Sequence, residues 1–179
     1  VVLPHAGNLG GGGFLVLHDV KSGQNIALDF REMAPRHASR NMFLDENGNI
    51  IAGKSLYSHD AIGVPGTVAG LEYALKKWGS LPLSEVIAPA IQLAEHGIPV
   101  SHSLAKMLNA AQEKLGKWPS SRAIFFQEDR PLRYGERLVQ QDLAHSLRLI
   151  SQQGSPVFYR GEIGDKIIAQ IQHHQGLMQ

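Results

Sequence analysis

The chain has 179 residues, of which 43% are hydrophobic and 18% charged, and its formal net charge is +1. Such a length and composition are typical of one globular domain, and the small net charge argues against nucleic-acid binding, which usually requires a basic face. Because the chain contains no cysteine, disulfides, a thiol nucleophile and cysteine metal sites are excluded.

The N-terminal part of the chain has the pattern of β-strands. Val1–Leu3 is apolar and predicts a strand, and Phe14–His18 is a continuous run of strand-forming residues. A run of this kind predicts a strand covered on both faces. Turn-forming residues at 21–25 lead into the alternating segment Ile26–Glu32, so the two runs predict a β-hairpin.

Helices dominate the rest of the chain. Their apolar spacing predicts helices over residues 67–78, 84–96, 101–115, 142–153 and 163–172. We expect Thr67 and Ser101 to be N-caps, and we expect Pro89 to break or kink the second helix. Ile124–Phe126 predicts a short strand between the helices.

The order of these elements indicates an α+β fold. Strands are expected mainly in residues 1–35 and helices mainly in residues 67–175, with no linker between them, so we expect one partial domain over residues 1–179. The abrupt ends suggest a segment of a longer chain, and neither end has the pattern of a signal peptide. No apolar run approaches the roughly 18 to 20 residues that cross a bilayer.

Four consecutive glycines, Gly10–Gly13, run directly into the first hairpin strand. Glycine is costly in backbone entropy, so this tract indicates a place where bare backbone is needed. Neither Gly-x-Gly-x-x-Gly nor Gly-x-x-x-x-Gly-Lys-Ser/Thr spacing is present, which disfavours a phosphate-binding loop. The remaining explanation from the residues alone is a close crossing of backbones between packed layers.

Arg31 is the candidate binding residue. Its planar guanidinium suits a carboxylate. In an extended strand Asp29 and Arg31 share one face about 7 Å apart, so Asp29 is placed to hold the guanidinium for a ligand. From the residues alone, a structural ion pair with Asp29 or Glu32 is the alternative.

The sequence indicates no second chemical site. The nine histidines show no His-Glu-x-x-His spacing, and adjacent His173 and His174 diverge by roughly 100° on a helix, so we expect no metal site. No Gly-x-Ser-x-Gly elbow is present. Thr67 has no evident base beside it, which favours a helix cap over a nucleophile.

Several ordered motifs resemble the N-terminal part of the large subunit of the gamma-glutamyltransferase family, also called gamma-glutamyltranspeptidase. They are Gly7–Phe14, Asp29–Pro35, Ser58–His59 with Gly63–Gly70, Pro89–Gly97, Gln141–Ala144 and Phe158–Gly161. The resemblance runs nearly the length of the chain. It implies part of the αββα sandwich of the N-terminal nucleophile hydrolases.

The resemblance also implies an enzyme made as a precursor that cleaves itself into a large and a small subunit. The small subunit's N-terminal threonine, activated by a nearby base, takes the gamma-glutamyl group from glutathione and related amides and passes it to water, an amino acid or a peptide. No catalytic residue is expected on this chain, and no cofactor is implied. Arg31 stands where the family's arginine binds the alpha-carboxylate of the glutamyl donor.

The implied partners are a small-molecule gamma-glutamyl donor, the remainder of the large subunit and the small subunit with its threonine. Self-association of the isolated segment is a further expectation. A glutaryl or cephalosporin acylase of the same superfamily remains an alternative, as does a non-catalytic fragment or binding domain. The sequence leaves the compartment open, and the resemblance suggests the periplasm or the cell exterior.

Overall fold

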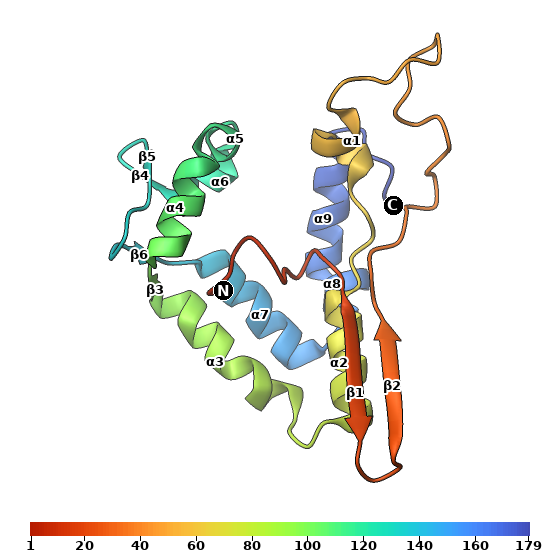
Figure 1. The fold of residues 1–179 in the computed structure, drawn as a ribbon, viewed down its shortest axis with the longest axis vertical. Helices are drawn as coiled ribbons and strands as arrows, with labels where there is room; N and C mark the ends of the chain where they lie inside the picture. Colours follow the sequence, from red (N-terminus) through yellow and green to blue (C-terminus); the bar gives the residue numbers. More distant parts are fainter. The chain divides into compact units, whose positions relative to one another are not determined.

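A computed structural model describes residues 1–179, and the chain is a mixed α+β protein, as expected (Figure 1). Its residues form two compact units. The first comprises Val1–Ala6 and Leu83–Gln152, and the second comprises Gly7–Pro82 and Gln153–Gln179. None of the helices combines the length and the apolar character needed to cross a membrane.

The predicted β-hairpin is confirmed in the second unit. Strands β1 (Phe14–Asp19) and β2 (Gln24–Asp29) pair antiparallel, from Phe14 opposite Asp29 to Asp19 opposite Gln24. The second strand was expected to continue to Glu32 but ends at Asp29. The carboxylate of Asp29 accepts the backbone N–H of Arg31 at 2.9 Å, and such a local bond competes with strand pairing.

One face of the hairpin is open in this chain, so the structure shows only one of the two faces that were expected to be covered as covered. Phe14, Val16 and Val20 have exposed fractions of 65%, 80% and 84%. The residues that alternate with this face on β1 are half-buried, namely Leu15, Leu17 and Asp19. The two faces of β1 therefore differ: one packs against the protein, and the other faces solvent in this chain.

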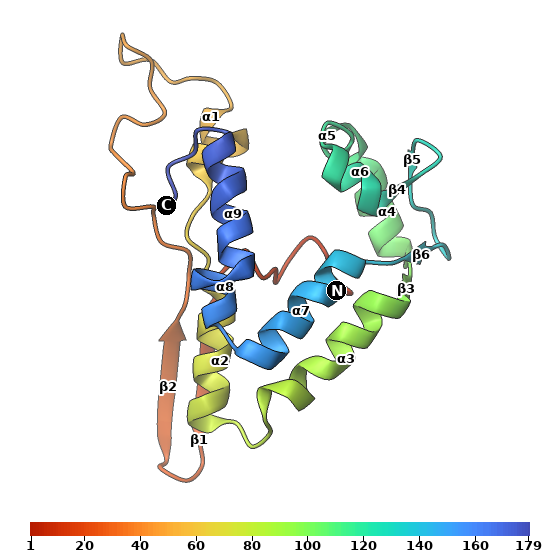
Figure 2. The ribbon, with the colours of Figure 1, turned by 180° about the vertical axis from the view of Figure 1, so that it is seen from behind.

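The second unit has five helices after the hairpin. They are α1 (Lys54–Tyr57), the 3-10 helix η1 (His59–Ala61), α2 (Thr67–Trp78), α8 (Pro156–Arg160) and α9 (Glu162–His173). Figure 2 shows α8 beside the start of α2, with α9 packed on α8. Gly66 is the N-cap of α2 and Thr67 is its first residue, so the predicted cap was one residue too late.

Glu72, buried on α2, ties this helix to the chain before α8. Its carboxylate accepts the Ser155 backbone N–H at 3.1 Å and pairs with Lys76 at 2.9 Å. Burial alone raises the pKa of Glu72, but hydrogen bonds from Ser155 and Lys76 outweigh burial, and the pKa is lowered overall. The carboxylate thus stays charged near neutral pH and holds two distant parts of the second unit together.

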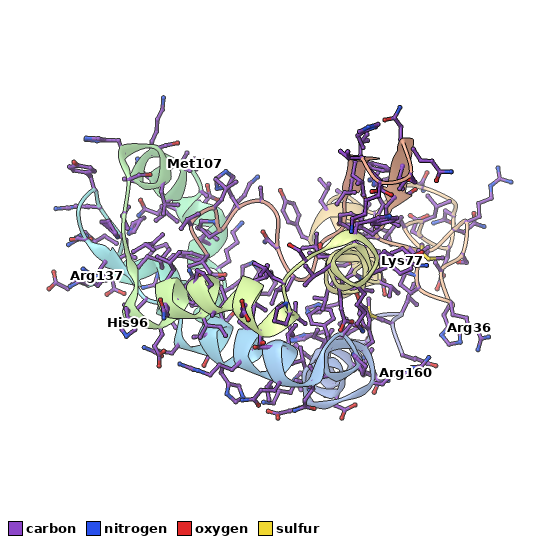
Figure 3. The ribbon with its side chains drawn as sticks, turned by 90° about the horizontal axis from the view of Figure 1, so that it is seen from below. Arg36, Lys77, His96, Met107, Arg137 and Arg160 are labelled. Carbon is purple, nitrogen blue, oxygen red and sulfur yellow. The ribbon has the colours of Figure 1, made fainter.

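The first unit is mainly helical. Its elements are α3 (Leu83–His96), β3 (Ile98–Pro99), α4 (His102–Ala110), α5 (Gln112–Gly116), α6 (Pro119–Phe125), β4 (Phe126–Gln127), β5 (Arg130–Pro131), β6 (Arg137–Leu138) and α7 (Gln141–Gln153). A core cluster contains Ile98, Val100, Leu104, Leu108, Leu132 and Leu138. Arg137 fixes the end of α3 by donating to the carbonyls of His96 and Gly97, both at 3.0 Å (Figure 3).

Several local predictions for this unit are confirmed and others were wrong. Ser101 caps α4 by accepting the Leu104 N–H at 3.1 Å, whereas Pro89 lies inside α3 without ending it. Ile124–Phe126 was expected to be a strand, but α6 extends to Phe125, because Pro119 at its first turn favours a helix start. The strand expected at Val1–Leu3 is absent.

Candidate functional site

The segment around Arg31 is fixed by backbone hydrogen bonds on both sides. Phe30 pairs with Gly13: the Phe30 N–H donates at 2.9 Å and its carbonyl accepts at 3.3 Å. Met33 pairs with Val64, through an N–H donated at 3.1 Å and one accepted at 2.7 Å. Arg31 therefore lies between two residues, Phe30 and Met33, whose backbones are held by hydrogen bonds.

Two glycine-rich segments approach this backbone too closely to carry side chains. A Cβ atom on Gly12 would lie 2.6 Å from the Phe30 carbonyl oxygen and 2.7 Å from the Arg31 Cα. A Cβ atom on Gly66 would overlap the same carbonyl, and one on Gly70 would overlap the Phe30 ring. The close backbone crossing predicted for the glycine tract is confirmed, and the segment is clamped from two directions.

The two glycine-rich segments also bind each other. The N–H groups of Gly66 and Thr67 donate to the Gly11 carbonyl at 2.8 and 3.0 Å. The Gly11 carbonyl is thus the acceptor for N–H groups at the start of α2, which have no partner within the helix. The start of α2, the glycine tract and the backbone before Arg31 therefore form one hydrogen-bonded assembly.

The Arg31 side chain is exposed and lines an open hollow of about 590 Å³. The hollow is lined by Gly10, Arg31, Glu32, Met33, Ala34, Pro35, Ala38, Met42, Phe43, Asp60, Ala61, Ile62 and Gly63. The Arg31 guanidinium carbon lies 5.9 Å from the centre of the Phe14 ring, within the range of a cation–π contact. An arginine held on a fixed backbone beside an open hollow is suited to bind a carboxylate.

Asp29 contacts Arg31 differently from what the strand pattern predicts. Its carboxylate accepts the Arg31 backbone N–H, so it fixes the direction of the main chain. Its role as a support for Arg31 stays a prediction, now with the backbone as the point of contact. Sequence reasoning missed Phe14 as a neighbour of the guanidinium, because this contact crosses between the two strands.

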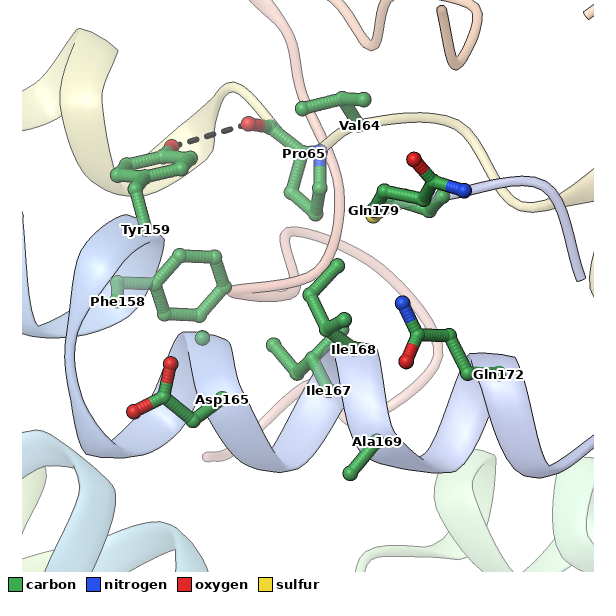
Figure 4. Close-up of a pocket in the computed structure, with 12 residues that line it drawn as sticks. Val64, Pro65, Phe158, Tyr159, Asp165, Ile167, Ile168, Ala169, Gln172 and Gln179 are labelled. Atoms are coloured by element: carbon green, nitrogen blue, oxygen red, sulfur yellow. Dashed lines mark hydrogen bonds between the residues drawn. The ribbon is translucent and has the colours of Figure 1, made fainter. Parts of the chain in front are cut away.

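A second hollow, of about 460 Å³, lies along α9 and is more apolar (Figure 4). Ile167, Ile168 and Phe158 line it, and its one charged side chain is that of Asp165. No arginine or lysine lines this hollow, so it offers no cation to pair with an acidic substrate. The structure has no cluster of histidine, cysteine and acidic residues that could hold a metal ion.

Comparisons with known proteins agree on one family. A sequence profile described as gamma-glutamyltranspeptidase matches residues 1–179. The chain is 48% identical over 179 residues to the glutathione hydrolase proenzyme of Escherichia coli (strain K12), covering 99% of this chain and 31% of that protein. It therefore spans less than a third of this curated relative.

Solved structures extend the likeness to the fold. The crystal structure of Helicobacter pylori gamma-glutamyltranspeptidase matches with a TM-score of 0.95 and 45% identity, over 99% of this chain and 51% of that one. A cephalosporin acylase from Bacillus halodurans matches with a TM-score of 0.81 and 28% identity, over 96% of this chain and 32% of that one. The backbone geometry described above thus belongs to a fold found in both proteins.

The clamp predicts that substitution of two glycines of the tract has different effects on stability. Gly12→Ala should destabilise the complete protein by about 1 to 3 kcal/mol, the usual cost of overpacking, because the new methyl group meets the Phe30–Glu32 backbone. Gly10→Ala is the matched control, since no atom lies within 4 Å of its added Cβ. Denaturation curves of the two variants test this, and equal stability would contradict the clamp.

Proposed function

The chain belongs to the gamma-glutamyltranspeptidase family, and on that premise we propose that it is a segment of an enzyme that transfers or hydrolyses gamma-glutamyl groups. The donors are glutathione and related amides. Because the chain spans only part of its relatives, this activity is assigned to the whole protein. The chain's own contribution is to bind the donor.

The observation that carries the proposal is the placement of Arg31. Its backbone is held at Phe30 and Met33, and its exposed side chain lines an open hollow. A guanidinium in a fixed position binds a carboxylate through two parallel hydrogen bonds, which orients the ligand as well as holding it. In this proposal Arg31 binds the alpha-carboxylate of the glutamyl donor, and Asp29 supports it through the main chain.

The chemistry comes from outside the chain in this proposal. The nucleophile is the N-terminal threonine of the small subunit, and the acyl-enzyme forms there. The hairpin belongs to an αββα sandwich completed by the rest of the large subunit and the small subunit, within one partial domain over residues 1–179. The open face with Phe14 and Val16 is the surface that these parts cover. The compartment proposed for the enzyme is the periplasm or the cell exterior.

A glutaryl or cephalosporin acylase is the second candidate, supported by the fold shared with the acylase structure. A glutaryl group also carries a distal carboxylate, so Arg31 would suit either acyl group. The family profile favours the glutamyl donor. A non-catalytic fragment or binding domain is the third candidate, and a gene that encodes no Thr-Thr-His type motif after Gln179 would favour it.

The first prediction concerns donor choice by the complete protein. It should release the amine from a gamma-glutamyl anilide faster than from the matching glutaryl anilide, because the family's donors carry an alpha-amino group that glutaryl lacks. Initial rates with both substrates at equal concentration decide between the two candidates. Faster turnover of the glutaryl substrate would favour assignment as an acylase over assignment as a gamma-glutamyl transferase.

The second prediction concerns Arg31 in the complete enzyme. Arg31→Ala should raise KM for the donor more than it lowers kcat, because the carboxylate is remote from the breaking bond and is bound alike in ground and transition states. Loss of a charge-assisted pair costs about 1.5 to 3 kcal/mol, and Arg31→Lys should recover only part of this. Steady-state kinetics measure both variants.

Arg36 provides the control for Arg31. It is also exposed and follows within the same loop, but it does not line the hollow. Arg36→Ala should therefore leave KM for the donor unchanged. If Arg31→Ala folds and retains the donor affinity of the unsubstituted enzyme, Arg31 is a structural residue.

The third prediction concerns the 179-residue chain alone. It should neither transfer nor hydrolyse a gamma-glutamyl anilide, because the proposed nucleophile is absent. It should also self-associate, since its hairpin exposes apolar side chains and unpaired strand edges. Light scattering and an anilide assay test both statements. Turnover by the pure chain would contradict a nucleophile on the small subunit. A well-dispersed monomer would contradict the proposal that the open face is normally covered by another part of the protein.

A further inference from the structure

Helix α2 begins at a residue that cannot carry a capping side chain. An N-cap residue usually supplies a side-chain oxygen to the N–H of the second or third helical residue. The N-cap of α2 is Gly66, and a Cβ atom there would overlap the Phe30 carbonyl oxygen. The packing that positions Arg31 therefore excludes serine, threonine and aspartate at this cap, and α2 needs its acceptor from elsewhere.

The Gly11 carbonyl accepts the N–H groups of Gly66 and Thr67, and the acceptor that replaces the cap side chain is the hydroxyl group of Tyr159 on α8. The N–H of Ala69, the third residue of α2, donates to the Tyr159 hydroxyl at 3.2 Å. The same hydroxyl donates to the Pro65 carbonyl at 3.0 Å (Figure 4). One oxygen thus performs the task of an N-cap side chain and also holds the residue that precedes the cap.

The hydroxyl group remains protonated under ordinary conditions. Burial raises the pKa of Tyr159, and the backbone hydrogen bond from Ala69 offsets only part of this effect. The proton is required for the bond to Pro65. Both hydrogen bonds are therefore maintained together at neutral pH.

The segment that Tyr159 holds is the segment that clamps the backbone at Arg31. Val64 pairs with Met33 on one side of Arg31. Gly66 and Gly70 lie against the carbonyl and the ring of Phe30 on the other side. Tyr159 binds Pro65 and Ala69, which lie between these contacts in the chain. A loss of the hydroxyl group would loosen both contacts at once.

We propose that Tyr159 is a positioning residue for Arg31: its hydroxyl group caps α2 in place of a side chain that Gly66 cannot carry, and so fixes the support of the carboxylate-binding guanidinium. The proposal rests on the proposed function for its effect on the substrate. The capping itself rests on contacts within the second unit alone. Tyr159 acts through the backbone and does not contact the substrate.

The test uses Tyr159→Phe in the complete enzyme, which removes one oxygen atom and keeps the ring. KM for a gamma-glutamyl anilide should rise about 3- to 10-fold, the range expected from one hydrogen bond, with kcat within about twofold. KM for the 4-aminobutyryl anilide, which lacks the alpha-carboxylate, should not change. Tyr73→Phe is the control, because Tyr73 is an exposed tyrosine of α2 itself.

A double-mutant cycle separates positioning from general stability. In the Arg31→Ala background Tyr159→Phe should raise KM no further, because the guanidinium that it positions is gone. Equal losses with both anilides, or additive losses in the cycle, would overturn the positioning role.

Hydrogen exchange distinguishes a failure of this proposal from a failure of the proposed function. In Tyr159→Phe the amides of Ala69 and Met33 should exchange faster than in the unsubstituted protein, and unchanged exchange would overturn the capping. If Arg31→Ala leaves KM unchanged, the proposed function of Arg31 fails. Faster exchange would then still support the mechanical link between Tyr159 and the Arg31 backbone.

Discussion

The packing of the Phe30 carbonyl against bare glycine backbone determines most of the geometry of the second unit. This carbonyl accepts the Gly13 N–H, and it lies where Gly12 and Gly66 would otherwise carry Cβ atoms. Such an approach brings the hairpin end, the glycine tract and the start of α2 into one assembly. The contacts of this carbonyl are with main-chain atoms, so the backbone position of Arg31 depends directly on them.

This dependence on backbone has an energetic consequence. Glycine loses more conformational freedom on folding than any other residue, so the clamp is costly to order. Hydrogen bonds between Gly11, Gly66 and Thr67, together with the buried Glu72 that holds Ser155, offset part of this cost. The helices of the second unit thus help to fix the loop on which the candidate binding residue lies.

Local pattern was sufficient to predict much of the fold. The hairpin follows from alternation and turn residues, and the Ser101 cap follows from a side chain that acts within its own helix. The cap at Gly66 could not be predicted, because the reason for glycine there is a carbonyl from another part of the chain. The open face of β1 was missed because an apolar run does not say which neighbours cover it.

The candidate site shows the same division. Arg31 was predicted from its residue type and its motif and stays a prediction, whereas the close crossing of the glycine tract was predicted from its composition and is confirmed. The form of the Asp29 contact and the capping by Tyr159 depend on distances between segments that no spacing reveals. For the close approach of Phe30 to α2, the available signal was the spacing of Gly66 and Gly70, since residues four apart share one face of a helix.

The crossing at Gly12 also keeps a positive charge at the hollow. Arg31 is the one cation among the residues that line it, and Glu32 and Asp60 line it as well. A slip of one residue along the glycine tract would move Arg31 out of its place, and Phe30 or the acidic Glu32 would stand there instead. The cation would then be lost from its place beside the two carboxylates. A stretch of residues without side chains therefore keeps the register on which the charge pattern of this surface depends.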